Sequence, residues 1–433
     1  MGWTRQRHAN ARSRIVWLAL LATFLVALGY MTVYRAAWDD IVRSDYTVYQ
    51  AAGKAVLDGT NIYQAHNSRG WDYMYPPLFA IAMVPLAKLS AAWGAAIWYL
   101  LTIASLGSAI YMCVALAREK YPRPGNQGRR VWILPAVLLS PWLISGVMRA
   151  QASEFVTWLM IAALYYDRRG EQISGGISLA FATLIKAFPV ILVAYFLLQR
   201  RWRFVSAFLL ALLVGALAPA AVFGWHGNLD YMQQWHELVT RPVMVASGPT
   251  AADPFRDQML NISRQRNQSL EALGLVIGFA PNQLRTWLAV VASVMFGAMY
   301  WVFRRRPDAG VTLAAAFFVW TVLVPPVSES HYFGLLLPPL SLLAAASLWE
   351  ANGLARWLAA AMLVVFAGVG PFVTIFKAAQ MYRPLCWMSL AAWGVLLVLA
   401  LRGRPVQPSI TTPAGTSAAV GGALRGRPTR PIS

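Results

Sequence analysis

Charged and strongly polar side chains interrupt the apolar sequence of this chain at a few places. A charged group at the centre of a membrane helix costs about 2.5–3.5 kcal/mol on insertion scales, so such interruptions indicate function. The interrupting side chains are carboxylates, cations, an imidazole, amides and a phenol, and they lie in short segments that are far apart in the chain. They are Asp45, Tyr75, Arg149, Gln151, Glu154, Lys186, Asn267, Gln268, Glu329 and His331.

These residue types suit transfer of a group from a phosphate carrier. A carboxylate can take the proton of an attacking hydroxyl, which is the task of a general base. Lys186, together with Arg149, could neutralise a phosphate leaving group, and His331 could orient the acceptor or contact that phosphate. From residue type alone, any aspartate of the predicted first external loop could be this base. These aspartates are Asp39, Asp40, Asp45, Asp58 and Asp72.

Most of these residues also have an ordinary structural interpretation. Asp45 could be a loop acid, Lys186 could extend its ammonium to lipid head groups, and Arg149 could anchor a helix end. His331 could cap or line a helix end. The tryptophans of the N-terminal third are expected to be mostly interfacial anchors rather than surfaces for stacking a sugar: Trp38, Trp71, Trp93 and Trp98.

The composition is that of an integral membrane protein. Of 433 residues, 58% are hydrophobic and only 12% are charged, whereas a soluble domain is about a quarter charged. The apolar blocks are long enough to cross a bilayer, which takes about 20 residues of helix. Spans in lipid must satisfy their own backbone groups, so the predicted fold is an all-α polytopic bundle.

The net charge of +20 does not indicate nucleic acid, because the basic residues lie in short clusters at the ends of apolar blocks. Such clusters mark cytoplasmic loops and contact anionic lipids. The two cysteines, Cys113 and Cys386, lie inside apolar blocks, so neither a disulfide frame nor a metal cluster is indicated. We expect no metal and no cofactor.

The basic clusters predict the topology. Residues 1–14 are a basic cytoplasmic N-terminus, residues 15–402 are the transmembrane catalytic domain, and residues 403–433 are a disordered cytoplasmic tail. Long external loops are expected at about 35–75 and 224–282, and a span over Phe204–Phe223. All the unusual polar residues then fall on the non-cytoplasmic side of the plasma (inner) membrane, which favours function over their structural interpretations.

Two stretches do not fit simple spans. Residues 76–90 are too short to cross and are expected to form a half-buried helix. Residues 173–199 start and end beside cytoplasmic clusters, so two short helices with a turn near Lys186–Pro189 are predicted, since Pro189 favours a break. About eleven to thirteen membrane segments result.

An ordered set of short motifs resembles glycosyltransferase family 87, over roughly residues 15–400. The first are Asp45-Tyr46-Thr47-Val48-Tyr49, the run from Leu57 to Tyr63, and Tyr75-Pro76-Pro77. Further along the chain come Lys186-Ala187-Phe188-Pro189, the run from Gln199 to Arg203, Asn267-Gln268-Ser269-Leu270, and Ser330-His331-Tyr332 followed by Leu337-Pro338.

The resemblance implies a GT-C-like membrane enzyme that transfers a sugar, usually mannose, with inversion from a polyprenyl-phosphate donor and without a nucleotide. It implies that Asp45 is the catalytic base. Tyr75, Arg149, Gln151, Lys186, Asn267, Gln268 and His331 are then the expected substrate-binding residues. Where many relatives carry Gly-Gln-x-Asn, this chain has Ala150-Gln151-Ala152-Ser153, so its sugar or acceptor can differ.

The predicted function is therefore a hexosyltransferase with a polyprenyl-phosphate-sugar donor, a glycolipid or glycan acceptor, membrane lipids as partners and no nucleic acid. The main alternative is a lipid or polysaccharide transporter, which would place its ionisable residues near the membrane midplane between repeated halves. A non-catalytic scaffold with the same fold is a third interpretation. The ionisable residues of this chain are predicted to cluster at one side of the membrane, and the sequence shows no apparent repeated halves. Both observations favour the enzyme over the transporter.

Overall fold

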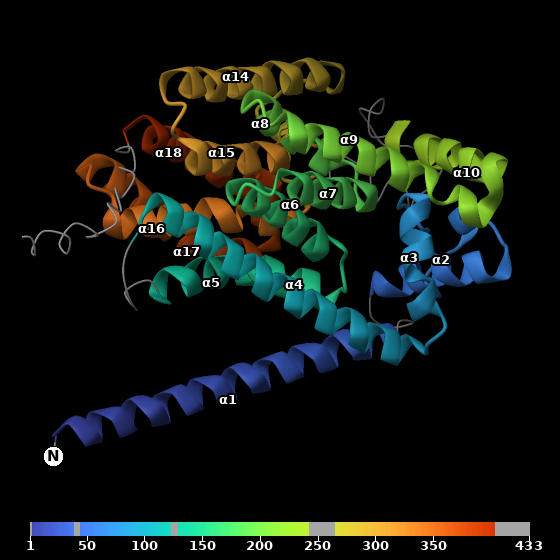
Figure 1. Cartoon of the computed structure of the whole chain (residues 1–433), viewed down its shortest axis with the longest axis horizontal. Helices are drawn as coiled ribbons and strands as arrows, with labels where there is room; N and C mark the ends of the chain where they lie inside the picture. Colours follow the sequence, from blue (N-terminus) through green and yellow to red (C-terminus); the bar gives the residue numbers. More distant parts are fainter. Residues whose placement is uncertain (1, 39–43, 123–128, 242–264, 403–433) are drawn as a thin grey trace, which may run out of the picture. The chain divides into compact units, whose positions relative to one another are not determined.

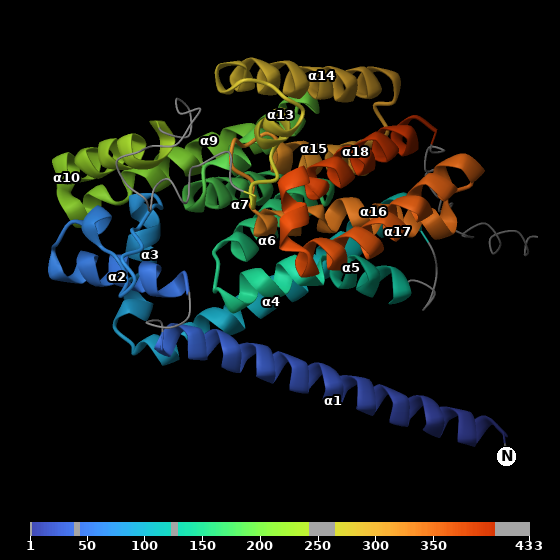
Figure 2. The ribbon, with the colours of Figure 1, turned by 180° about the vertical axis from the view of Figure 1, so that it is seen from behind.

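The computed structural model describes residues 2–38, 44–122, 129–241 and 265–402. The predicted tail at 403–433 and the acids Asp39 and Asp40 lie outside these ranges. Within them the chain is helical, apart from loops and one isolated antiparallel bridge between His66 and Asp72. Figure 1 and Figure 2 show the arrangement of the helices from opposite sides.

The helices confirm the predicted all-α membrane fold. In the described residues, six helices are long and apolar enough to cross a membrane, or seven if one bent pair counts as a span. Their apolar stretches are Ser13–Ala37, Ala91–Lys120, Pro281–Arg305, Ser330–Trp349, Gly353–Ile375 and Pro384–Arg402. The described residues also contain five shorter apolar helices, and two of them, Pro77–Ala87 and Gln172–Ile185, lie in the two stretches that did not fit simple spans.

The larger hydrophobic core lies in the main helical bundle. It is formed mainly by residues of eight helices: α4 (Ala91–Lys120), α5 (Arg129–Met148), α6 (Ser153–Arg168), α7 (Gln172–Ile185), α15 (Gly310–Leu323), α16 (Leu337–Trp349), α17 (Gly353–Ile375) and α18 (Pro384–Arg402). The helix α15 is the most enclosed of these, since nearly all its side chains are buried. α1 (Gly2–Ala37) packs along α4, and α14 (Leu284–Arg305) along α15.

A second, smaller core surrounds α2 (Tyr46–Asp58) and α3 (Pro77–Ala87), which pack against each other. The buried residues of α2 include Tyr46 and Tyr49, so this stretch of the predicted external loop is a folded helix with an apolar face. It ends at Gly59, whose φ of 67° suits glycine and whose N–H bonds the carbonyl of Ala55. Figure 1 shows α2, α3 and α10 together at one end of the molecule.

Helix breaks expose polar residues where α7 ends. The helix stops at Ile185, Lys186 is extended, and the chain continues as a short 3₁₀ helix, η3 (Phe188–Leu192), and α8 (Val193–Leu198). This matches the predicted pair of short helices and the predicted break. Pro189 lacks a backbone N–H, which disfavours continuation of α7.

One predicted span is shorter than expected. α9 (Trp202–Leu217) ends before the predicted limit at Phe223 and bends by 89° into α10 (Ala220–Trp235). Pro219 follows the end of α9, and Gly224 has a φ of 74° inside α10. Both residues interrupt regular helix, so the apolar run continues without continuing the span.

Candidate active site

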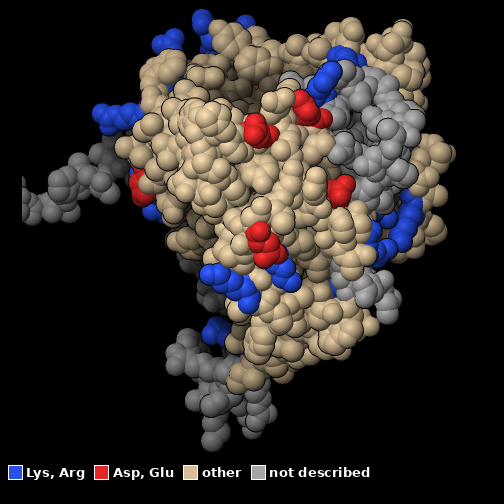
Figure 3. Space-filling model, turned by 90° about the vertical axis from the view of Figure 1, so that its right-hand side faces the viewer, with Lys and Arg blue, Asp and Glu red and all other residues tan. Residues whose placement is uncertain are grey.

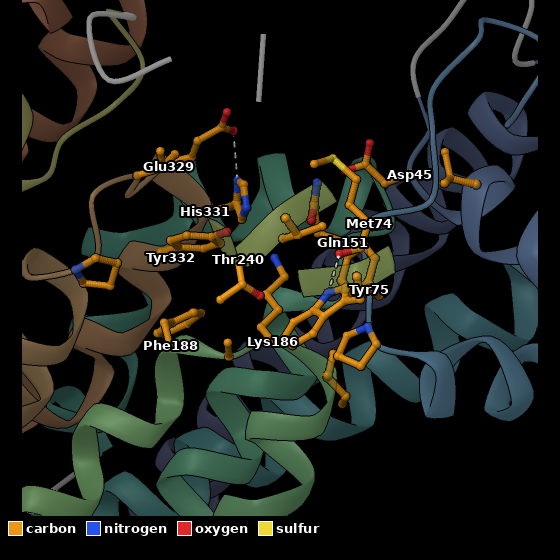
Figure 4. Close-up of a pocket in the computed structure, with 18 of the residues that line it drawn as sticks. Asp45, Met74, Tyr75, Gln151, Lys186, Phe188, Thr240, Glu329, His331 and Tyr332 are labelled. Atoms are coloured by element: carbon orange, nitrogen blue, oxygen red, sulfur yellow. Dashed lines mark hydrogen bonds and ion pairs between the residues drawn. The ribbon is translucent and has the colours of Figure 1, made fainter. Parts of the chain in front are cut away.

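A pocket of about 380 Å³ lies where the two hydrophobic cores meet. Its lining includes Tyr75 and Trp235, which pack on the smaller core, and Phe188 and Tyr332, which pack on the larger one. Figure 4 shows Glu329, His331 and Tyr332 on one wall and Asp45, Met74, Gln151 and Tyr75 on the other, with Lys186 between them. Five predicted site residues thus line one cavity: Asp45, Tyr75, Gln151, Lys186 and His331.

Asp45 lies at the start of α2, with 9% of its surface exposed. Its backbone N–H donates to the carbonyl of Arg149 over 2.8 Å, which fixes the helix start against the turn after α5. An aspartate in this position commonly caps its helix with its side chain. Here the carboxylate makes no capping bond, and Asp45 lines the pocket.

Arg149 and Gln151 belong to a tight turn between α5 and α6, where Ala150 adopts a left-handed φ of 52°. The Arg149 guanidinium bonds back to Ser145, with its Nη2 2.9 Å from the Ser145 Oγ, and Arg149 does not line the pocket. Gln151 does line the pocket and is 6% exposed. The side chains of this predicted pair therefore do different things: Gln151 faces the pocket, and Arg149 holds the turn that positions Asp45.

Lys186 provides the ammonium of the pocket. Its Nζ donates to the Ser153 hydroxyl over 2.7 Å. The same Nζ lies 4.6 Å from the centre of the Tyr332 ring and 5.7 Å from that of Tyr75, in cation–π contact. An ammonium lined by two rings and one hydroxyl retains the capacity to bond an anion.

His331 lies in the first turn of η6 (Ser330–Leu336). Its Nδ1 is 3.5 Å from Oε2 of Glu329, which forms an ion pair when the imidazole is protonated. The His331 ring also contacts Tyr332 edge-on, with ring centres 4.6 Å apart. Glu329 thus orients the imidazole at the rim of the pocket.

Tyr75 joins the loop before α3 to the site. Its hydroxyl is 2.8 Å from that of Tyr49, and the backbone N–H of Ala152 donates to the Tyr49 oxygen over 3.3 Å. Burial, followed by the nearby Asp45 carboxylate, raises the pKa of the Tyr75 hydroxyl. The phenol therefore stays protonated and can serve as a neutral hydrogen-bonding group.

Asn267 and Gln268 are buried and lie outside the pocket lining. Asn267 holds the segment before η6: its Nδ2 donates to the Pro326 carbonyl over 2.8 Å, and its Oδ1 accepts from the Ser328 N–H over 2.9 Å. Gln268 Nε2 donates to the carbonyl of Gln380 over 3.0 Å. Direct substrate binding by either residue stays a prediction, while the contacts described here fix the loop that carries Glu329.

Replacement of Asn267 by leucine is expected to destabilise the protein by about 3 kcal/mol, because it leaves the buried backbone N–H groups of Ser269 and Ser328 without their acceptor. Unfolding in mixed micelles, followed by circular dichroism, measures the change. Asn352→Ala is the matched control, since it removes one N-cap bond of α17 and should cost about 1 kcal/mol. Equal losses in both variants would contradict the structural role of Asn267.

Several pocket residues were not identified as site residues from the sequence. Tyr332, Phe188, Trp71 and Trp235 line the pocket. Trp71 was expected at the membrane interface and is here part of the pocket wall. With 19 tryptophans, 17 tyrosines and 19 phenylalanines in the chain, aromatic type alone carries no signal. The usable indications were the position of Tyr332 beside His331 and that of Phe188 in the same short motif as Lys186.

No group of three or more histidine, cysteine, aspartate or glutamate side chains in the described residues is arranged to hold a metal ion. The charges at the pocket are instead those of carboxylates, one ammonium and one imidazole. Such a set can remove a proton at one wall and neutralise an anion at the other.

Comparison with known proteins identifies the class. The model of glycosyltransferase family 87 matches residues 73–326, which is more than half of the chain. The chain therefore belongs to glycosyltransferase family 87 and is a membrane glycosyltransferase, not a member of the transporter class.

One curated relative is similar over much of its length. It is the polyprenol-phosphate-mannose-dependent alpha-(1-2)-phosphatidylinositol mannoside mannosyltransferase of Mycolicibacterium smegmatis (strain ATCC 700084 / mc(2)155), 26% identical over 324 residues, which are 69% of each chain. Two crystal structures of ArnT from Cupriavidus metallidurans also match. The one bound to undecaprenyl phosphate has a TM-score of 0.37 at 14% identity, covering 90% of this chain and 78% of that one. The apo structure has a TM-score of 0.38 at 17% identity, covering 91% and 78%.

Proposed function

We propose that this enzyme transfers a hexose, specifically mannose, from a polyprenyl-phosphate donor to a hydroxyl of a glycolipid or glycan on the non-cytoplasmic face of the plasma membrane. The observation that carries the proposal is that Asp45 and Lys186 line the same pocket from different elements. A base and a phosphate clamp in one cavity are what transfer from a sugar phosphate requires.

In the proposed mechanism, the acceptor hydroxyl approaches Asp45, which takes its proton as the oxygen attacks the anomeric carbon. The bond between that carbon and the phosphate oxygen breaks, and the lipid phosphate leaves with the electron pair. Lys186 stabilises the charge that develops on this oxygen, and His331, oriented by Glu329, bonds the phosphate. Gln151 and Tyr75 position the sugar. Family resemblance favours inversion at the anomeric carbon.

A lipid-linked donor is supported by the apolar side of the pocket. Ile185, Val190 and Ile191, which lie close to Lys186 in the chain, line it, and Val190 is 44% exposed. The curated relative depends on polyprenol-phosphate-mannose according to its name. A phosphate at Lys186 would thus leave its hydrocarbon chain beside an apolar lip that is compatible with lipid.

The proposed sidedness follows from the charge distribution. Basic residues in the last turns of α4, α6, α14 and α18 mark the cytoplasmic ends of these helices. The pocket is lined by loops and helix ends away from these basic turns, for example by Gln151 just before the opposite end of α6. Both termini are then cytoplasmic, and cytoplasmic nucleotide sugars do not reach the site.

The test is transfer of radiolabel from polyprenyl-phosphate-[³H]mannose by the purified chain in lipid nanodiscs, with phosphatidylinositol mannosides and octyl α-D-mannopyranoside as acceptors. We expect transfer from the lipid donor and none from GDP-[³H]mannose. Transfer from the nucleotide donor alone, or no transfer from the lipid donor, would overturn the proposal.

A further inference from the structure

The loop between η1 (Ile62–Gln64) and α3 presents Trp71 and Asp72 to the pocket. The proposed transfer uses neither residue. Trp71 packs on the smaller core, together with Tyr75 and the tyrosines of α2. Both residues therefore belong to the Asp45 side of the pocket rather than to the side of His331 and Tyr332.

Asn67 fixes the shape of this loop. It is 7% exposed, and its Oδ1 accepts from the backbone N–H of Arg69 over 3.1 Å and of Trp71 over 3.0 Å. Its own N–H donates to the carbonyl of Trp71 over 3.1 Å, and Gly70 takes a φ of 73° that permits the tight turn. The conformation at Trp71 is thus set by the loop itself.

The same asparagine ties the loop to the catalytic end of α2. Asn67 Nδ2 donates to the Thr47 hydroxyl over 3.1 Å, and Thr47 is two residues after Asp45. Asp72 is further held by the bridge to His66. Trp71 and Asp72 are therefore presented by a segment that is anchored beside Asp45, which favours a fixed binding surface.

The charges divide the pocket between two kinds of ligand. Lys186 provides the site for an anion, on the side where the carboxylate of Glu329 is paired with His331, whereas Asp45 and Asp72 give the other side two carboxylates that repel an anion. An uncharged ring with several hydroxyls suits that side, because carboxylates accept bonds from hydroxyls and an indole covers the apolar face of a pyranose. Figure 3 shows that the described part of the end carrying α2, α3 and α10 is mostly uncharged, with small acidic and basic patches.

We infer that Trp71 and Asp72 form the subsite for a neutral pyranose ring of the acceptor, Trp71 stacking on the ring and Asp72 bonding its hydroxyls. The inference rests on the proposed function, since it takes the Lys186 side for the donor phosphate. According to this inference, Trp71 and Asp72 determine the specificity for the acceptor, and their substitution leaves donor binding unchanged.

The experiment measures equilibrium binding of tritiated octyl α-D-mannopyranoside to the full chain in nanodiscs, with 1-O-octylglycerol as a ligand that lacks the ring. Trp71→Ala and Asp72→Asn should each weaken binding of the glycoside about fivefold to tenfold. Trp71→Phe should fall between Trp71→Ala and the native chain. Binding of undecaprenyl phosphate, measured on the same samples, should stay within about twofold and reports correct folding.

Trp225→Ala and Asp58→Asn are the matched controls, since Trp225 is 55% exposed and Asp58 is exposed at the end of α2. Equal glycoside binding by native chain and pocket variants, or no ring-dependent binding by the native chain, would overturn the subsite. Loss of undecaprenyl phosphate binding in pocket variants that keep the native circular dichroism spectrum would overturn the assignment to the acceptor. If the native chain does not transfer mannose but the ring-dependent loss is seen, the proposed function fails and the subsite stands.

Discussion

Asp45→Asn is expected to reduce the initial rate of mannose transfer by about 10²–10⁴-fold, the usual contribution of a general base. The amide has nearly the shape of the carboxylate but cannot take the proton of the acceptor hydroxyl. The fold should be kept, because the substitution leaves in place the bond from the backbone N–H of residue 45 to the Arg149 carbonyl. Transfer from polyprenyl-phosphate-[³H]mannose at matched expression gives the rate.

Asp58→Asn serves as the control for this experiment, because Asp58 is in the last turn of the same helix and is exposed. It should transfer mannose at the native rate, and both variants should bind undecaprenyl phosphate as the native chain does. An Asp45→Asn variant with an unchanged transfer rate would remove Asp45 from the chemistry.

The second large effect is expected for Lys186→Met, which should impair use of the donor. Loss of a charged partner of the phosphate should lower kcat/KM for the donor by about 10²–10³-fold, as for removal of a group that stabilises charge in the transition state. The methionine keeps an unbranched apolar stem beside Tyr332, so the packing of the break after α7 should persist. Binding of undecaprenyl phosphate should weaken together with transfer, since the ammonium contacts the phosphate in both states.

Lys54→Met is the matched control, because Lys54 is exposed on α2, and should leave both quantities unchanged. Lys186→Arg should recover part of the activity, as it keeps the charge but cannot reproduce the bond to the Ser153 hydroxyl in the same geometry. Native phosphate binding in Lys186→Met would assign the phosphate to another part of the pocket.

The helices of the bundle could be predicted because they are continuous apolar blocks, and α4, α6, α14 and α18 also carry basic residues in their last turns. The break near Lys186 could also be predicted, since Pro189 and two flanking basic clusters force the chain back to the same side. The bend after Leu217 could not, because the residues beyond it are equally apolar until Gly224. The helical nature of α2 was missed although Tyr46, Tyr49 and Gly53 share one buried face.

Only some of the predicted site residues lie together in the structure. Ionisable residues in apolar surroundings gave the strongest indication, and Asp45, Lys186 and His331 line the same pocket. Amides were weaker guides, because an asparagine can bind a substrate or complete backbone bonds equally well, as Asn267 does at Pro326. Arg149 illustrates the same limit, since its carbonyl rather than its guanidinium is what positions Asp45.

The pocket lies between two separately packed cores, and Ile185 packs against both of them. The proposed donor half and the proposed acceptor half could therefore diverge independently within a family. Substitutions in the segment from Asp45 to α3 alter the acceptor side while the helices around Lys186 remain intact. An exchange of this segment between relatives is thus a route to enzymes that keep one lipid donor and decorate different glycans.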